Sequence, residues 1–354
     1  MNLIDRYIIG AVIAGVLLVL TVIVVLSSFL LFVGQFDNIG VGSYALGDAL
    51  LYVVLKAPQQ AYEIFPIATL MGALLGLGGL ATHSELIVMR AAGVTTWRLA
   101  GAVAMAGVLL ALMAAGLGEV LAPPAEQYAV SSKAIRMHSR LAFTRNGAWL
   151  RNGDMFISVG NLATQSDLGQ LKIYSFDPEG RLEVAATVGR AVFQDGGWQV
   201  YGYRESQLHA DGSVTVSHQQ SRNWSEGMDP DLMNLIAQDP DALGMVGLID
   251  YIDYLQRNAL DDSNFQVALW SRVSTLVAVL FMTILALPFN FGGLRSAGAG
   301  QRVFFGVLIG AGFFLFDRTF SNTGQVYGLH PLVTAWLPTL VLIAITLFMV
   351  RRVR

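Results

Sequence analysis

The chain has 354 residues, none of which is cysteine, and only 13% of them are Asp, Glu, Lys or Arg. An average soluble protein has roughly 25% of these charged residues. The absence of cysteine excludes disulfide bonds, thiolate chemistry and cysteine metal sites, so every folded part must be held by packing alone. Low charge combined with 54% hydrophobic residues favours an integral membrane protein.

The chain also lacks the short motifs of energy-converting enzymes. A phosphate-binding loop needs Gly-x-x-x-x-Gly-Lys followed by Ser or Thr, and the lysines at Lys56, Lys133 and Lys172 stand in other contexts. The histidines show no His-Glu-x-x-His spacing, and no Gly-x-Ser-x-Gly elbow occurs. We therefore expect no catalytic residue, no metal and no bound cofactor, so any energy input must come from a partner.

Long stretches without a charged residue predict six membrane helices. Most of these stretches reach the roughly 20 residues that span hydrocarbon. The helices are expected at about 8–33, 58–80, 99–121, 267–290, 302–321 and 331–350. The fifth is short for a span, so we expect the side chain of Arg302 to extend from its inner end towards the lipid headgroups.

Basic residues predict the orientation of these helices. An even number of helices puts both termini on one side, together with Arg6, Arg90, Arg98, Arg295, Arg302, Arg351, Arg352 and Arg354. The opposite short segments hold only Lys56 and Arg318, so the positive-inside rule makes both termini cytoplasmic. The long segment between the third and fourth helices then lies on the other side of the membrane.

That long segment, residues 123–264, changes from apolar to turn-rich composition. Turn signals recur at Asn152-Gly153, Asp177-Pro178-Glu179-Gly180, Asp195-Gly196-Gly197 and Asp211-Gly212. Alternation in "KIYSF" and "WQVYGY" predicts an antiparallel β-domain with one packed and one exposed face. An amphipathic helix from Val246 to Arg257 should lead into the fourth membrane helix. The chain thus divides into helices one to three (1–122), an inserted β-domain (123–264) and helices four to six (265–354).

A polar stretch, "LATHSELIVMRAAGV" from Leu80 to Val94, interrupts the apolar region between the second and third membrane helices. Thr82-x-x-Glu85 fits a capping box and Gly93 is a natural stop, which predicts a helix of about ten residues within 82–93. So short a helix is marginal by itself and needs a neighbour. The neighbour is either the lipid headgroups, with Glu85 only a cap, or a partner protein that pairs with Glu85.

Several segments together resemble the lipopolysaccharide export permeases of the LptF/LptG family. They are "LIDRYI", "GSY" at Gly42 to Tyr44, "LLGLGGLATHSELIVMRAAGV", "GEVLAP" at Gly118 to Pro123, "DPDAL" at Asp239 to Leu243, and "FGGLRSAGAGQRV" at Phe291 to Val303. The resemblance covers essentially the whole length, and "LRS" matches the G-type form of the family. It implies six transmembrane helices with an inserted, jellyroll-like periplasmic β-domain in the inner membrane.

The resemblance also implies partners for a permease that is not itself an enzyme. An LptF-like permease would form the heterodimer, and an LptB-like ATPase dimer would bind ATP and dock beneath. An LptC-like protein would continue the periplasmic bridge, and no nucleic acid partner is expected. The segment around Glu85 would be the coupling helix that contacts the ATPase. Its implied coupling residues are Ser84, Glu85, Leu86, Met89, Arg90 and Gly93.

Lipopolysaccharide would need an apolar cavity within the membrane and basic groups near its outer surface. The candidate cargo residues are Phe313, Phe316 and Phe320 in the fifth helix, and Lys133 and Arg136 after the third. The chain departs from its relatives after the first helix, where it has Asp37 instead of lysines. Alternatively, the phenylalanines face lipid or neighbouring helices, Lys133 is a solvated surface residue, and the other permease supplies the basic groups.

Two other functions stay open from the residues alone. One is a permease of similar design that moves another lipid or a lipoprotein. The other is a membrane sensor whose outer β-domain binds a ligand, although the short cytoplasmic segments leave only 80–98 to serve as its output.

Overall fold

The computed structural model describes residues 3–137, 148–152, 155–159, 162–164, 167–177, 181–194, 197–209, 213–224, 243–258, 260–291 and 298–352. Its helices are α1 (Leu3–Val33), α2 (Leu46–Thr82), α3 (Glu85–Ala91), α4 (Thr96–Gly116), α5 (Ala122–Met137), α7 (Met245–Arg257), α8 (Ser263–Phe291), α9 (Ala299–Val326) and α10 (Pro331–Arg352). A 3₁₀ turn, η1 (Phe36–Asn38), follows α1, and a π-helical segment, η2 (Leu117–Leu121), joins α4 to α5.

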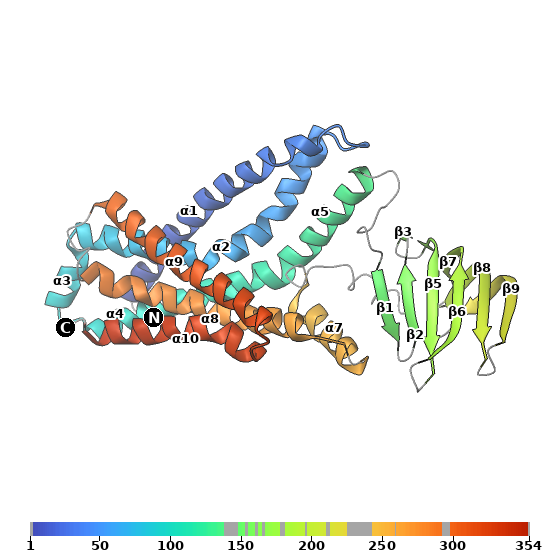
Figure 1. Cartoon of the computed structure of the whole chain (residues 1–354). Coiled ribbons are helices and arrows are strands. Elements are labelled where there is room, and N and C mark those ends of the chain that lie inside the picture. Colours follow the sequence, from blue (N-terminus) through green and yellow to red (C-terminus); the bar gives the residue numbers. More distant parts are fainter. Residues whose placement is uncertain are drawn as a thin grey trace.

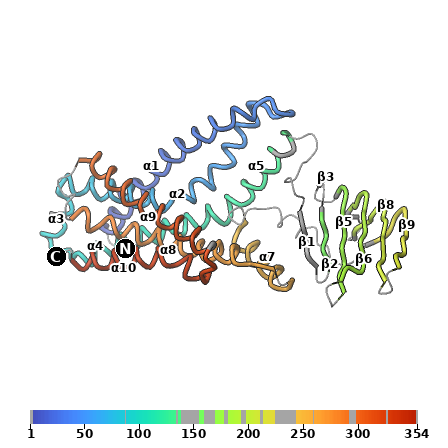
Figure 2. Tube along the Cα trace, in the orientation of Figure 1, coloured from blue at the N-terminus to red at the C-terminus, as the bar shows by residue number. Residues whose placement is uncertain are grey.

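Six helices in the described part are long and apolar enough to cross a membrane: α1, α2, α4 with its continuation, α8, α9 and α10. The six predicted membrane helices are therefore confirmed. Within this part α2 is central, since it contacts α1, α5, α8 and α9. Figure 1 places α3, the beginning of α1 and the end of α10 towards one end of the helical part, and the β-sheet beyond the other. The tube in Figure 2 follows the same path.

The third membrane helix continues further than its apolar residues indicate. The sequence predicts an end near residue 121, but η2 and α5 carry the helix on to Met137. The helix widens to π geometry immediately before Pro123 and Pro124, which have no N–H for the preceding carbonyls. Helix α5 extends beyond the apolar part of the span, so its residues can be polar. For this reason the apolar pattern of the sequence did not predict it.

Glycines set the distance between α1 and α2. A Cβ on Gly15 would lie 2.3 Å from the Gly72 carbonyl oxygen, and one on Gly76 would lie 2.3 Å from the Ala11 carbonyl oxygen. In α9, a Cβ on Gly306 would lie 2.8 Å from the Met71 side chain of α2, and one on Gly310 would lie 2.8 Å from the Ile67 side chain. These small residues therefore allow close helix packing within the subunit, as in other membrane helix pairs.

The inserted domain is an antiparallel sheet, which confirms the predicted β-rich insertion in a six-helix membrane protein. Its strands are β1 (Ala148–Asn152), β2 (Met155–Val159), β3 (Leu162–Thr164), β4 (Asp167–Leu168), β5 (Leu171–Phe176), β6 (Leu182–Val188), β7 (Arg190–Gln194), β8 (Gly197–Leu208) and β9 (Val214–Trp224). They are ordered β1-β2-β5-β6-β8-β7-β4-β3, and β9 pairs with β8.

The sheet turns a corner at two glycines. The first half of β8 pairs with β7 and its second half with β6, and Gly202 between the halves has φ +66°. This conformation suits glycine because it has no Cβ. Opposite it, Gly189 donates its N–H to the Tyr201 carbonyl oxygen at 3.0 Å. Trp198 and Tyr203 on either side of the corner belong to one buried cluster, so the sheet curls around its own core.

Candidate functional site

The polar segment between the second and third membrane helices forms α3, but its start differs from the prediction. The helix has seven residues and begins at Glu85, after Ser84 in a left-handed conformation with φ +60°. The predicted Thr82–Glu85 capping box is wrong, because α2 runs through Thr82 and the Thr82 hydroxyl donates to the Gly78 carbonyl oxygen at 2.8 Å. A threonine in a last helical turn commonly bonds backward in this way.

The predicted stop at Gly93 is confirmed. Gly93 has φ +87°, its N–H donates to the Arg90 carbonyl oxygen at 3.0 Å, and the Val94 N–H donates to the Met89 carbonyl oxygen at 3.1 Å. This pair of bonds is a Schellman motif, which only a residue tolerant of positive φ can close. Val94 then packs against the apolar core and anchors the segment.

The residues implied for ATPase coupling lie on different faces of the α3 segment. Leu86 is 2% exposed and Met89 packs against the apolar core, so both attach α3 to its own subunit. Ser84, Arg90 and Gly93 are exposed. The guanidinium carbon of Arg90 lies 5.4 Å from the ring centroid of Phe291, at the end of α8. Only some of the residues that the resemblance implied for coupling are therefore accessible to a partner on the outward face of α3.

Glu85 is half-buried, and its carboxylate interacts with the hydroxyl of Tyr7 near the start of α1. Two apolar residues that were not selected from the sequence stand out nearby in the chain. Val88 is 65% exposed and Trp97 is 68% exposed. The sequence signal for Trp97 was a tryptophan directly after the loop between α3 and α4. Whether its side chain points outward depends on how these two helices pack, which the sequence does not show. The segment thus presents one carboxylate together with exposed apolar side chains.

A cavity of about 460 Å³ is lined by α2, α8 and α9, together with Thr339 of α10. Phe313 lines it, whereas the predicted cargo residues Phe316 and Phe320 are not among its lining residues. Its wall is more polar than expected, with Gln59, Glu63, Ser271, Arg272, Thr275, Asp317, Arg318 and Asn322. Phe316 and Phe320 instead lie near one another on α9, with ring centroids 6.1 Å apart.

Arg272 connects this cavity to the chain that returns from the sheet. The residue is 6% exposed, and its guanidinium lies 2.7 Å from a carboxylate oxygen of Glu119 in η2. It also donates to the carbonyl oxygens of Gly118 and Leu243. The other carboxylate oxygen of Glu119 accepts the N–H of Met245, the first residue of α7, at 2.6 Å. Neither residue was selected from the sequence, because their pairing joins positions 153 residues apart.

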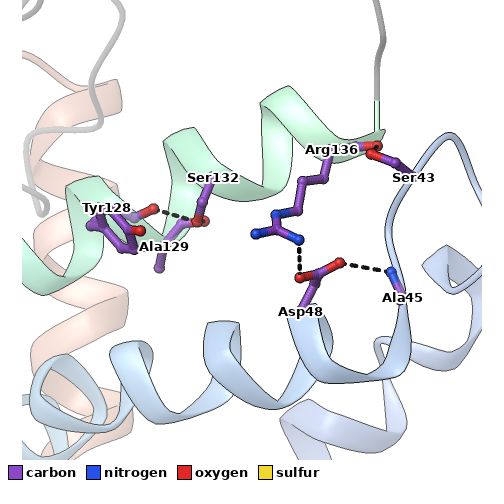
Figure 3. A network of polar contacts seen from close by, with 7 residues as sticks. All are labelled: Ser43, Ala45, Asp48, Tyr128, Ala129, Ser132 and Arg136. Carbon is purple, nitrogen blue, oxygen red and sulfur yellow. Dashed lines mark hydrogen bonds and ion pairs between the residues drawn. The ribbon is translucent and has the colours of Figure 1, made fainter.

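The predicted basic residues Lys133 and Arg136 lie on α5, away from the cavity lining. Lys133 donates to the Gln35 side-chain oxygen at 2.8 Å, and its ammonium lies 4.7 Å from the centroid of the Tyr52 ring. Arg136 pairs with Asp48 at 2.5 Å, as Figure 3 shows. The structure therefore does not bring these two residues together with Phe313 in one pocket.

Figure 3 also shows how α5 is held at its end. The Asp48 carboxylate pairs with Arg136 and accepts the N–H of Ala45 at 2.9 Å. The N–H and hydroxyl of Ser43 both donate to the Arg136 carbonyl oxygen, at 2.8 and 3.1 Å. Gly42 lies against this carbonyl with φ +64°, and a Cβ at this position would clash with the Arg136 carbonyl oxygen at 2.6 Å. The loop between α1 and α2 thus fixes the end of α5.

In the described part of the chain no three histidine or acidic side chains form a group that could hold a metal ion. Six spans, a short helix between two of them and an inserted sheet define a multi-pass membrane protein. The family described as "Lipopolysaccharide export system permease LptF/LptG" matches residues 6–352, and the chain belongs to this family.

Two relatives are similar over their full length. The chain is 34% identical to the lipopolysaccharide export system permease protein LptG of Escherichia coli K12 over 354 residues, which cover 99% of this chain and 98% of the relative. It is 31% identical to the protein of the same name in Haemophilus influenzae over 357 residues, covering 100% and 99% of the two chains.

Proposed function

We propose that this chain is the G-type permease subunit of an ABC transporter that extracts lipopolysaccharide from the inner membrane. An LptF-like permease would be its heterodimer partner. An LptB-like ATPase dimer would hydrolyse ATP, and an LptC-like protein would receive the cargo on the periplasmic side. The observation that carries the proposal is a short helix between two membrane spans that begins with Glu85, in a chain of the LptF/LptG family without a phosphate-binding loop.

The α3 segment is the proposed docking site for the ATPase. Glu85, the first residue of α3, presents a half-buried carboxylate that interacts with the Tyr7 hydroxyl. Exposed Val88 and Trp97 supply apolar area beside it in the chain. A carboxylate on a segment that also exposes an aromatic and an aliphatic side chain suits a partner groove that contains an arginine or lysine. Leu86 and Met89 act from the inside, because they transmit force from α3 to the core of the subunit.

The orientation follows from the basic residues. Arg90 lies in α3 and Arg98 in the first turn of α4, and α10 ends with Arg351 and Arg352. Figure 1 shows α3 and the end of α10 towards the same end of the helical part. The positive-inside rule favours the cytoplasm for this end. The sheet then lies in the periplasm, where it would meet the bridge protein.

The second permease would face α9. In α9 only 11% of the most apolar stretch is buried inside the chain, against 72% in α2. An apolar helix that its own subunit leaves uncovered faces either lipid or another subunit. The cavity beside α9, with Phe313 in its wall, would then open towards the space between the two permeases and take part of the cargo. Lys133 and Arg136 would contact the phosphorylated headgroup only by exchanging their present partners.

Purification of the ATPase with both permeases tests the proposal. Glu85→Ala should lower the amount of bound ATPase and the ATP hydrolysis of the complex, and Glu85→Gln should do the same if the charge is what binds. Glu183→Ala, on an exposed position of β6, is the matched control and should behave as wild type. Normal ATPase binding and hydrolysis in Glu85→Ala would contradict the docking assignment.

Liposomes test the cargo. In the presence of ATP, the complex should release lipopolysaccharide to the bridge protein. From control liposomes that contain no lipopolysaccharide, it should release no phospholipid. Release of phospholipid or of a lipoprotein instead would favour a related permease with another substrate. Unchanged lipid distribution with ATP would contradict transport altogether.

A further inference from the structure

From its place at the inner end of the fifth membrane helix, Arg302 was predicted to extend its side chain towards the lipid headgroups. The structure shows instead that this side chain is buried. The residue is 3% exposed, and both Nη1 and Nη2 donate to the hydroxyl oxygen of Thr82 at 3.1 Å. Thr82 is the last residue of α2, and α3 begins three positions later at Glu85. Arg302 therefore links α9 to the point from which the docking helix extends.

The contact is built on both sides. The Thr82 hydroxyl donates its own proton to the Gly78 carbonyl oxygen at 2.8 Å, which turns its lone pairs towards Arg302. Gly78 leaves the room that the arginine occupies. A Cβ at that position would lie 2.5 Å from Arg302 Cδ and 2.6 Å from both Nε and Nη1. The arginine thus lies across a glycine of α2 and ends on a threonine that is already oriented.

A buried guanidinium does not leave such a contact easily. A guanidinium that loses its hydrogen-bonding partners while it stays buried is strongly disfavoured, because its charge is then uncompensated. A displacement of Thr82 therefore favours a matching displacement of the start of α9. The neighbouring contacts of α9 with α2, Gly306 on Met71 and Gly310 on Ile67, are apolar and can slide more readily than a pair of hydrogen bonds.

The same helix reaches the cavity. Phe313 and Asp317 of α9 both line it, and they follow Arg302 by about three and four helical turns. Helix α9 is continuous from Ala299 to Val326. One continuous helix thus has its first turn against the end of α2, from which the docking helix extends, and its middle in the cavity wall.

We infer that Arg302 is a positioning residue that couples the docking helix α3 to the cavity-lining helix α9 through the hydroxyl of Thr82. The inference rests on the proposed function, since it assumes that the ATPase moves α3. Movement of α3 shifts the end of α2, Arg302 carries the shift to α9, and the cavity wall changes shape. Arg302 itself touches neither ATP nor cargo in this arrangement.

Two adjacent glycines provide a matched test. Gly78→Ala should push the guanidinium away from Thr82, whereas a Cβ on Gly79 meets nothing within 4 Å. The full complex with the ATPase and the second permease is placed in liposomes that contain lipopolysaccharide. We expect Gly78→Ala to keep the ATPase bound and hydrolysing ATP, but to release about tenfold less lipopolysaccharide per ATP, the scale of a typical coupling free energy. Gly79→Ala should match wild type.

Thr82 variants keep the test decisive if Gly78→Ala fails to fold. Thr82→Val removes the hydroxyl at almost constant volume and should lower release per ATP, while Thr82→Ser should restore it. Wild-type release per ATP in Thr82→Val would overturn the inference. Loss of the ATPase from Thr82→Val would also overturn it, because the contact would then shape docking. A failure of the proposed function is separate, since it would leave the Glu85→Ala complex with normal ATPase binding.

Discussion

The guanidinium of Arg272 and the carboxylate of Glu119 form an ion pair of 2.7 Å that joins two membrane helices to the start of α7. Glu119 stands in the π-helical segment, so the widened turn places its carboxylate between Arg272 and the N–H of Met245. π-helical turns are frequent at functional sites. This pair fixes the chain that returns from the sheet against the wall of the cavity.

Breaking that pair should destabilise the protein. Arg272→Gln leaves the half-buried Glu119 without its charged partner and removes the donors to the Gly118 and Leu243 carbonyl oxygens, a loss of about 2 kcal/mol for charged hydrogen bonds. Thermal unfolding in detergent measures the effect. The control is Arg257→Gln, which breaks an exposed pair with Asp253 on α7 and should cost less than about 0.5 kcal/mol. Equal stability of the two variants would show that Arg272 is not held as described.

The α1–α2 contact predicts a second difference in stability. Gly15→Ala would place a methyl group 2.3 Å from the Gly72 carbonyl oxygen, so the helices must separate. Overpacking of this kind costs about 2 kcal/mol. Gly10→Ala, on the same helix, meets nothing within 4 Å and should leave the unfolding temperature unchanged. A Gly15→Ala protein as stable as Gly10→Ala would contradict the close packing.

Helix α7 predicts a dependence of stability on alkaline pH. Burial raises the pKa of Tyr251 from 10.0 to about 12, and its ring lies against that of Phe265, with centroids 4.5 Å apart. The folded state therefore keeps its proton where the unfolded state loses it, so stability is complete below pH 10 and falls as pH rises towards 12. Tyr251→Phe should flatten this decline in an unfolding series from pH 9 to 12. An unchanged slope would place Tyr251 in a more exposed environment.

Crosslinking distinguishes the predicted cargo residues. A photoreactive phenylalanine at Phe313, in the cavity wall, should crosslink to lipopolysaccharide more strongly than one at Phe316. Phe348, which is 63% exposed on α10, is the matched position for contact with bulk lipid. Equal crosslinking from Phe313 and Phe348 would remove the cavity from the cargo path.

Patterns of the chain alone determined the membrane class, the six spans, the inserted antiparallel sheet and the stop of α3 at Gly93. The spans depend on long apolar runs, the strands on alternation of apolar and polar residues, and the helix stop on a glycine that can adopt a positive φ. Each of these is specified by residues that are close together in the sequence. The continuation of the third helix through α5 was not predicted, because a helix beyond the apolar part of a span needs no apolar pattern.

Only the tertiary structure decided where individual side chains act. Thr82 was expected to cap α3, but it lies in α2 and accepts hydrogen bonds from Arg302, which is 220 residues away in the chain. Leu86 was grouped with the docking residues, but its side chain packs into the core. Arg272 and Glu119 meet across 153 residues. Local sequence specifies helices and turns, whereas the direction of a side chain and the partner of a buried charge depend on which helices lie side by side.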